Sequence, residues 1–178
     1  MHRFLILAAA LACLPSMAHA KGRSSEIGTS NKFGLGIVLG SPTGGTGKLY
    51  VGRSGGALQA SLATWLAPWG WYDHGGSGFY TDLEYLWHPV ELAHGGSVVV
   101  PLHAGVGGFL SRGGGGWFWH DRDWHGDWVE VGPRGVVGLD FDLTRIPLQF
   151  FVDVGVNVTV YPGFWPDATL GTGARWFF

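Results

Sequence analysis

The chain has little charge and almost no cysteine. Its one cysteine, Cys13, lies in an apolar N-terminal run, so the rest of the chain has no thiol for a disulfide framework. Only 13% of the 178 residues are charged, against about 25% in ordinary soluble domains. The net charge of -2 gives no electrostatic reason to expect a nucleic acid partner.

Long apolar runs are also missing. After residue 21 none reaches the ~18 to 20 residues that a membrane-spanning helix requires. If the chain crosses a membrane, it must therefore cross as strands. Lipid offers no partner for the backbone groups of an open sheet edge, so those strands would have to close into a barrel.

The first 20 residues have the pattern of a secretory signal peptide. Met1 to Arg3 is positively charged, Phe4 to Leu14 is apolar, and Ala18-His19-Ala20 forms a small-x-small cleavage site. The stretch before Cys13 resembles a lipoprotein signal, although Ala stands where Leu is usual. We expect export, followed by a short segment over residues 21–31.

Residues 148–161, "LQFFVDVGVNVTVY", show strand periodicity most clearly. Val152, Val154 and Val156 fall on one parity, whereas Asp153 and Asn157 fall on the other. Successive side chains of a strand point to opposite faces, so one face is apolar and the other polar. The run is longer than the roughly 5 to 6 residues of an ordinary strand and suits a membrane-crossing strand of about 9 to 11.

The same alternation predicts an all-β fold, an eight-stranded antiparallel up-and-down transmembrane β-barrel over residues 32–178. The expected strands are 32–40, 45–52, 56–66, 78–88, 97–110, 128–141, 147–161 and 167–178. With both termini in the periplasm, periplasmic turns fall at Arg53–Gly55, Pro89–Gly96 and Asp142–Ile146. Outer loops then fall at Ser41–Gly44, Ala67–Ser77, Ser111–Asp127 and Pro162–Pro166.

The polar parity predicts a network inside the barrel. Its candidate residues are Lys48, Asp82, Glu84, His103, Glu130, Arg134, Asp153 and Arg175. A soluble lipocalin-like barrel would have the reverse arrangement, with its apolar face inside. Because the lumen of an eight-stranded barrel is only wide enough for side chains, we expect these charges to pair, with a narrow pore as the alternative.

Aromatic residues gather where strands end. Trp65, Trp69, Trp71, Trp117, Trp119, Trp124, Trp128 and Trp165 are expected at the outer boundary, and Tyr85, Trp87, Trp176 and Phe178 at the periplasmic one. Amphipathic rings favour membrane interfaces, which predicts two girdles. The final strand ends on Phe178 and resembles the terminal signal read by the outer-membrane assembly machinery.

The stretches "KFGLGIVLGSPTGGTGKLYV", "YTDLEYLWHP", "PLHAGVGGFL", "PRGVVGLDFDL" and "GARWFF" resemble a family of small bacterial outer-membrane barrels. That family is similar in architecture to OmpA/OmpX-type barrels. The resemblance spans nearly the whole chain after the signal peptide and consists of strand and turn patterns. It implies a fold and an outer-membrane location, and it carries no catalytic motif to transfer.

The segment "SRGGGGWFWHDRDWHGDW" is the candidate ligand loop, through Trp117, Trp119, His120, Trp124 and His125. Trp is favoured where one side is apolar and the other wet, so an extracellular protein, a glycan or lipopolysaccharide is the expected partner. A metal on His120, Asp121, Asp123, His125 and Asp127 is the alternative. Their spacing meets no standard ligand pattern, and we predict no metal or cofactor there.

A lipid A-modifying enzyme is a further alternative, because catalysis needs only a nucleophile, a base and an orienting group within reach. His74 with Ser77, or His103 with Ser61 and Glu84, could supply them, although neither set forms a recognisable motif. We therefore expect a monomeric, non-enzymatic barrel in contact with outer-membrane lipid and lipopolysaccharide, presenting its outer loops to a ligand. The competing functions are a narrow channel and this enzyme.

Overall fold

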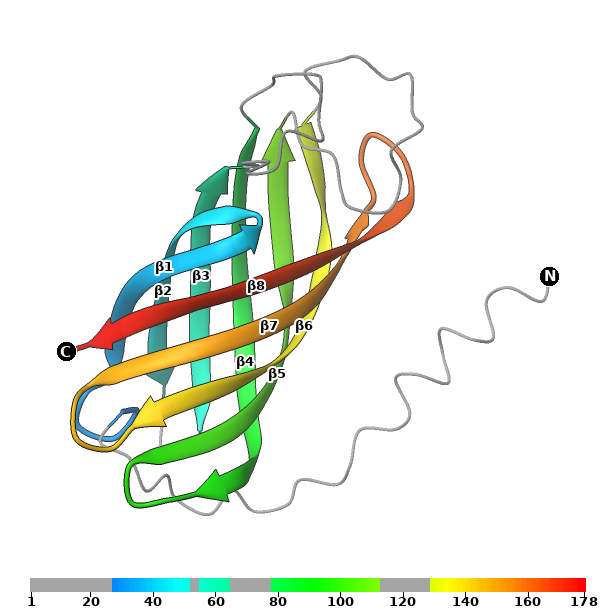
Figure 1. Ribbon diagram of the computed structural model, residues 1–178. Coiled ribbons are helices and arrows are strands. Elements are labelled where there is room, and N and C mark those ends of the chain that lie inside the picture. The colour runs from blue at the N-terminus through cyan, green and yellow to red at the C-terminus, as the bar shows by residue number, and fades with distance from the viewer. Residues whose placement is uncertain (1–26, 52–54, 65–77, 113–128) are drawn as a thin grey trace.

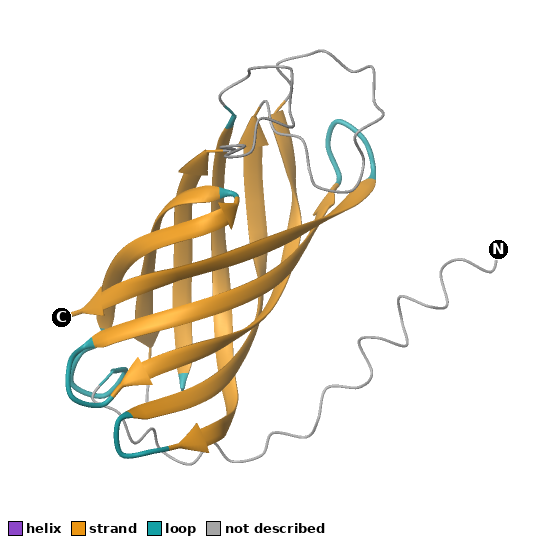
Figure 2. Ribbon diagram, viewed as in Figure 1, coloured by secondary structure: helices purple, strands orange, loops and turns teal. Residues whose placement is uncertain are grey.

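The computed structural model describes residues 27–51, 55–64, 78–112 and 129–178. Its strands are β1 (Phe33–Ser41), β2 (Thr43–Val51), β3 (Gly56–Thr64), β4 (Phe79–His94), β5 (Val98–Arg112), β6 (Val129–Leu143), β7 (Leu148–Thr159) and β8 (Trp165–Phe177). Each pairs antiparallel with its neighbours in sequence, and β1 pairs with β8 to close the barrel (Figure 1). The predicted eight-stranded fold is confirmed. No described helix is long and apolar enough to cross a membrane (Figure 2).

The two ends of the barrel differ in what they carry. The β4–β5 and β6–β7 turns lie at the same end as the C-terminus and the segment that enters β1 (Figure 1). We call this the terminal end and the opposite one the loop end. The wall is also uneven: β1, β2 and β3 have nine residues each, whereas β4 has 16 and β5 and β6 have 15.

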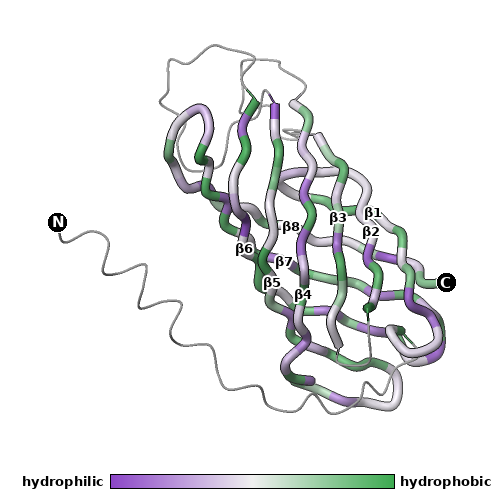
Figure 3. The backbone as a smooth tube through the Cα atoms, turned by 180° about the vertical axis from the view of Figure 1, so that it is seen from behind, coloured by the Kyte–Doolittle hydropathy of each residue, from purple (hydrophilic) through white to green (hydrophobic). Residues whose placement is uncertain are grey.

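Strand residues alternate between an exposed apolar face and a buried, largely polar one. In β7, Val152, Val154 and Val156 are 41 to 54% exposed, while Asp153 and Asn157 on the other parity are buried. Figure 3 shows the same alternation of hydropathy along the strands. The acid within the most apolar run of the chain therefore points into the barrel, as its parity predicts.

The predicted turn at Pro89–Gly96 is wrong, because β4 continues to His94. Its pairing with β5 is interrupted by register shifts between Trp87 and Val90 and between Glu91 and Ala93. Proline has no N–H for the ladder and is tolerated at such bulges. A Pro next to a strand end therefore marks an irregularity here and not a turn.

Other boundaries shift by a few residues. β2 begins at Thr43, so Pro42 is the only residue between it and β1, where a loop over Ser41–Gly44 is predicted. β6 extends to Leu143, which makes Asp142 a strand residue and not the start of a turn. Backbone pairing with the partner strand, Asp142 opposite Gln149, holds it in the sheet.

Glycines on the inward face let neighbouring strands approach closely. A Cβ added to Gly107 would lie 2.0 Å from the carbonyl oxygen of Leu83 on β4. At the adjacent Gly108, on the outward face, the nearest atom would be 3.5 Å away. The inward glycine is thus required for the close packing of the wall, which leaves the lumen narrow.

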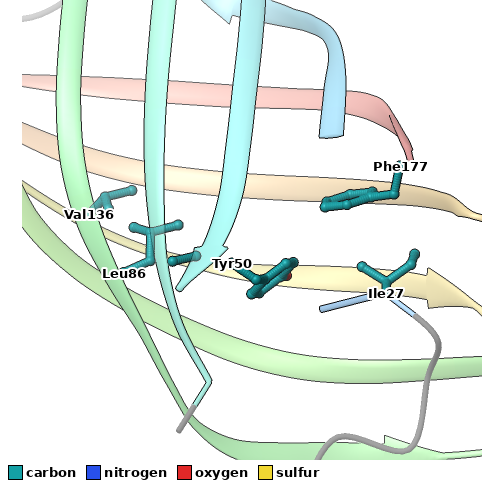
Figure 4. Close-up of a cluster of buried hydrophobic side chains, with 6 residues drawn as sticks. Ile27, Tyr50, Leu86, Val136 and Phe177 are labelled. Carbon is teal, nitrogen blue, oxygen red and sulfur yellow. The ribbon is translucent and has the colours of Figure 1, made fainter. Parts of the chain in front are cut away.

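Apolar side chains fill the lumen toward both ends. Near the terminal end lies a cluster of Ile27, Tyr50, Ala57, Leu86, Val136 and Phe177, most of them labelled in Figure 4. Near the loop end lies a smaller cluster of Ala63, Tyr80 and Phe109. Ile27, from the segment predicted to precede the barrel, is 1% exposed and belongs to its core.

Candidate functional site: the polar network of the lumen

Seven of the eight residues predicted to form an interior network are buried. Lys48, Glu84, His103 and Arg175 are at most 1% exposed, and Asp82, Arg134 and Asp153 are 6 to 8% exposed. Glu130 also lies on the inward parity but is only half-buried, close to the loop end of β6. The polar residues fall into two groups, and on β4 and β6 the apolar residues Leu86 and Val136 stand between them.

The Arg134 cluster consists of Arg134, Asp82, Glu84, Asn157 and Thr169. The Arg134 Nε atom donates to Glu84 Oε1 and lies 3.8 Å from Asp82 Oδ2. Its Nη1 atom donates to Asn157 Oδ1 at 2.9 Å and to Thr169 Oγ1 at 2.7 Å. One guanidinium thus joins side chains of β4, β7 and β8 from its position on β6.

The Asp140 cluster lies nearer the terminal end and consists of Asp140, Lys48, His88, His103 and Asp153. Lys48 Nζ donates to Asp140 Oδ2 at 2.6 Å, and His88 Nε2 lies 3.1 Å from the same oxygen. His103 lies between two acids, with Nδ1 3.4 Å from Asp140 Oδ1 and Nε2 2.9 Å from Asp153 Oδ1. The cluster brings together side chains of β2, β4, β5, β6 and β7.

Arg175 is held by neutral acceptors, one of which, Gln59, donates in turn to Glu84 Oε2 of the Arg134 cluster at 3.2 Å. It donates to Gln149 Oε1 at 3.1 Å, to Gln59 Oε1 at 2.7 Å and to Thr46 Oγ1 at 3.2 Å. Its guanidinium carbon lies 3.7 Å from the ring centroid of Phe151, an arrangement that stabilises a desolvated cation through the π face.

Several members of the network were not among the predicted site residues. His88 is the last residue of the predicted strand 78–88, and its parity with Asp82 and Glu84 indicates that it points inward. Asp140 and Gln149 lie on the inward parity of β6 and β7 but have no predicted role, and the inward Phe151 departs from the expectation of a polar face. Parity identifies which side chains point inward but not which of them meet.

The lumen is filled by these side chains. A cavity of about 20 Å³ lies among Asp82, Arg134, Phe151, Asp153 and Arg175. A water molecule requires roughly 10 to 15 Å³, so this space holds about one. A cavity of this size does not by itself form a passage through the described part of the barrel.

The enzyme alternative gains no support from the described residues. His103 contacts Asp140 and Asp153, and Ser61 accepts a hydrogen bond through its backbone carbonyl from Thr81 Oγ1 at 2.9 Å. Neither ring nitrogen of His103 makes a hydrogen bond to Ser61 or Glu84 in the part of the chain that the structure describes. His74 and Ser77 lie outside the described residues, as do the ligand-loop residues Trp117, Trp119, His120, Trp124 and His125 and the metal alternative built on that loop.

A search of solved structures finds the N-terminal β-barrel domain of Pseudomonas aeruginosa OprF, with a TM-score of 0.52 over 83% of this chain and 98% of that one. The chain shares that barrel fold. Sequence identity is 11%, so the likeness speaks for the fold alone. No protein-family model matches the chain, and no curated protein matches it significantly. The predicted OmpA-type barrel architecture is confirmed.

Replacing Arg134 with methionine should leave Glu84 and Asp82 without their cation. Removal of one partner from a buried ion pair costs about 3 to 5 kcal/mol, and we expect a loss of that size in the free energy of unfolding measured by urea titration. The double variant R134M/E84Q should recover part of it. R145M, in an exposed turn, should stay within about 0.5 kcal/mol of wild type. Equal unfolding free energies for R134M and R145M would contradict the pairing.

Proposed function

We propose that the chain is a non-enzymatic structural barrel of the bacterial outer membrane. The observation that carries this proposal is the inversion of the fold: the outward face is apolar while ionised groups occupy the lumen. Leu35, Leu62, Leu83 and Val106 are each more than half exposed on that face. An apolar band of this extent on a soluble monomer would promote aggregation, whereas lipid covers it at no cost.

The ends of the barrel support an orientation with the terminal end in the periplasm. Trp176 and Phe178 are exposed there at 46 and 65%. Outer-membrane barrels pair short periplasmic turns with longer outer connections, and the β4–β5 and β6–β7 turns are short. Phe178 would then be available to the assembly machinery, and lipid and lipopolysaccharide would be the resident partners of a monomer.

Placement in a bilayer predicts that the cost of a charge on the outward face depends on depth. Val154 lies in the middle of β7, whereas Ile146 lies in the β6–β7 turn, and both are exposed, at 54 and 44%. V154R should lower the unfolding free energy in lipid vesicles by roughly 2 to 4 kcal/mol, and I146R by roughly 0 to 1 kcal/mol. Indistinguishable values for the two variants would contradict membrane burial of this face.

A filled lumen favours a structural barrel over a narrow channel. The purified protein in planar bilayers should therefore show no steady single-channel conductance in potassium chloride. The double variant R175A/F151A, which removes the stacked pair next to the cavity, is the positive control. Conductance from this variant would show that the assay detects an opened lumen. Regular open-channel steps from the wild-type protein would favour the channel function instead.

The ligand proposal depends on the Trp-rich connection between β5 and β6. Alternating Trp and polar residues suit the stacking and hydrogen bonding by which proteins hold sugars, so we expect a surface glycan, including the sugars of lipopolysaccharide. W117A/W119A/W124A should lose binding to immobilised glycans, whereas W176A, at the opposite end of the barrel, should keep it. Equal binding by both variants, or no glycan binding by wild type, would remove this part of the proposal.

Lipid A mass spectrometry after expression checks the enzyme alternative, which predicts altered acyl chains.

A further inference from the structure

In its neutral form, the His88 ring has no hydrogen on the nitrogen that faces Asp140. His88 Nδ1 contacts the carbonyl oxygen of Gly55, which can only accept, so Nδ1 carries a hydrogen. In the neutral ring the lone pair is then on Nε2, which lies 3.1 Å from Asp140 Oδ2. Two acceptors this close repel unless positive charge neutralises them; Lys48 Nζ, 2.6 Å from the same oxygen, supplies one charge, and a proton or a metal ion on Nε2 would supply another.

His103 repeats the arrangement on the other oxygen of the same acid. Its Nε2 atom lies 2.9 Å from Asp153 Oδ1, and its Nδ1 atom lies 3.4 Å from Asp140 Oδ1. Neither nitrogen of His103 has a hydrogen bond of good geometry among the described residues, nor does Asp140 Oδ1. Buried polar atoms in this state are rare and call for a partner.

The three donor groups lie close enough together to be candidate metal ligands. Ligand atoms of His88, His103 and Asp140 lie within 4.8 Å of one another. A tetrahedral zinc ion with bonds of about 2.0 to 2.2 Å holds its ligand atoms roughly 3.3 to 3.6 Å apart, and the Nδ1–Oδ1 separation is 3.4 Å. The second nitrogen of each ring lies against a carbonyl or a carboxylate, as is usual for histidines that bind metals.

The charge balance of the lumen leaves room for a divalent cation. Among the described residues the buried acids are Asp82, Glu84, Asp140, Asp142 and Asp153, and the buried permanent cations are Lys48, Arg134 and Arg175. The acids exceed these cations by two. Lys48 Nζ already contacts Asp140 Oδ2 at 2.6 Å, so Oδ1 is the oxygen left for a metal.

We propose that the Asp140 cluster is a buried site for one divalent transition metal, best suited to Zn²⁺. Its ligands are His88 Nε2, His103 Nδ1 and Asp140 Oδ1, a nitrogen and oxygen set that zinc accepts. The ion joins β4, β5 and β6 inside the barrel and supplies the two missing positive charges. The competing arrangement places one proton on each histidine, which gives two imidazolium ions and the same total charge.

The test uses the purified protein, folded in detergent and dialysed against Zn²⁺. Elemental analysis should find one zinc per chain, and the thermal midpoint should rise with zinc and fall with a chelator. Cobalt in place of zinc should give the visible absorption of a tetrahedral nitrogen and oxygen site. H88Q and H103Q should lose the bound ion, and D153N should bind it about 10 to 100-fold more weakly.

Matched controls separate this site from other histidines. H120A/H125A removes the imidazoles of the loop between β5 and β6, and H94A removes an exposed histidine of β4 whose side chain is 57% exposed. Both should keep the zinc. Loss of the ion in H120A/H125A, or its retention in folded H88Q, would overturn the assignment.

A wild-type measurement decides the case where the variants fail to fold. Ring ¹⁵N spectra in excess zinc should show His88 protonated at Nδ1 alone and metal-bound at Nε2. Two doubly protonated rings, or a folded wild-type barrel that binds no zinc, would overturn the proposal in favour of the imidazolium pair. Neither outcome bears on the membrane placement, which is tested separately by comparing V154R with I146R.

Discussion

The lumen of an eight-stranded barrel is only as wide as the side chains that fill it, and most of the structure follows from that limit. Inward charges have almost no water to solvate them, so each must find a partner from another strand. Arg134 meets Glu84 and Asp82, and Lys48 meets Asp140. Arg175 receives neutral acceptors and the face of Phe151. Inward glycines such as Gly107 keep the wall close enough for these contacts.

The same limit arranges the interior in layers. Tyr80 and Phe109 close the loop end, while Ile27, Tyr50 and Phe177 close the terminal end. The polar network is shielded from bulk water. This shielding strengthens each hydrogen bond and ion pair, and it raises the free-energy cost of any buried polar group left without a partner. Side chains therefore fill the lumen of this barrel. Its interior chemistry is confined to what the buried side chains themselves can hold.

Sequence alone predicts the wall well and the network only in part. Alternation is a local property, so the inward position of Asp153 and the outward position of Val154 could be read from neighbouring residues. Strand ends are not local: Asp142 falls in a predicted turn because the sequence pattern does not show that pairing with β7 extends β6, just as pairing with β5 extends β4 past Pro89. Which inward groups meet depends on the stagger between strands. That is why Asp140, whose partners come from β2, β4 and β5, had no predicted role.

In the proposed bilayer placement, the unequal strands would have a consequence for the surrounding lipid. On one flank the wall consists of nine-residue strands, and on the other of strands with 15 or 16 residues. If the barrel spans a bilayer as proposed, acyl chains beside the short flank would have to compress to match it, or the cylinder would have to lean until both flanks fit, at fractions of a kcal/mol per Å of mismatch. The bilayer would then be locally thinner next to β1, β2 and β3.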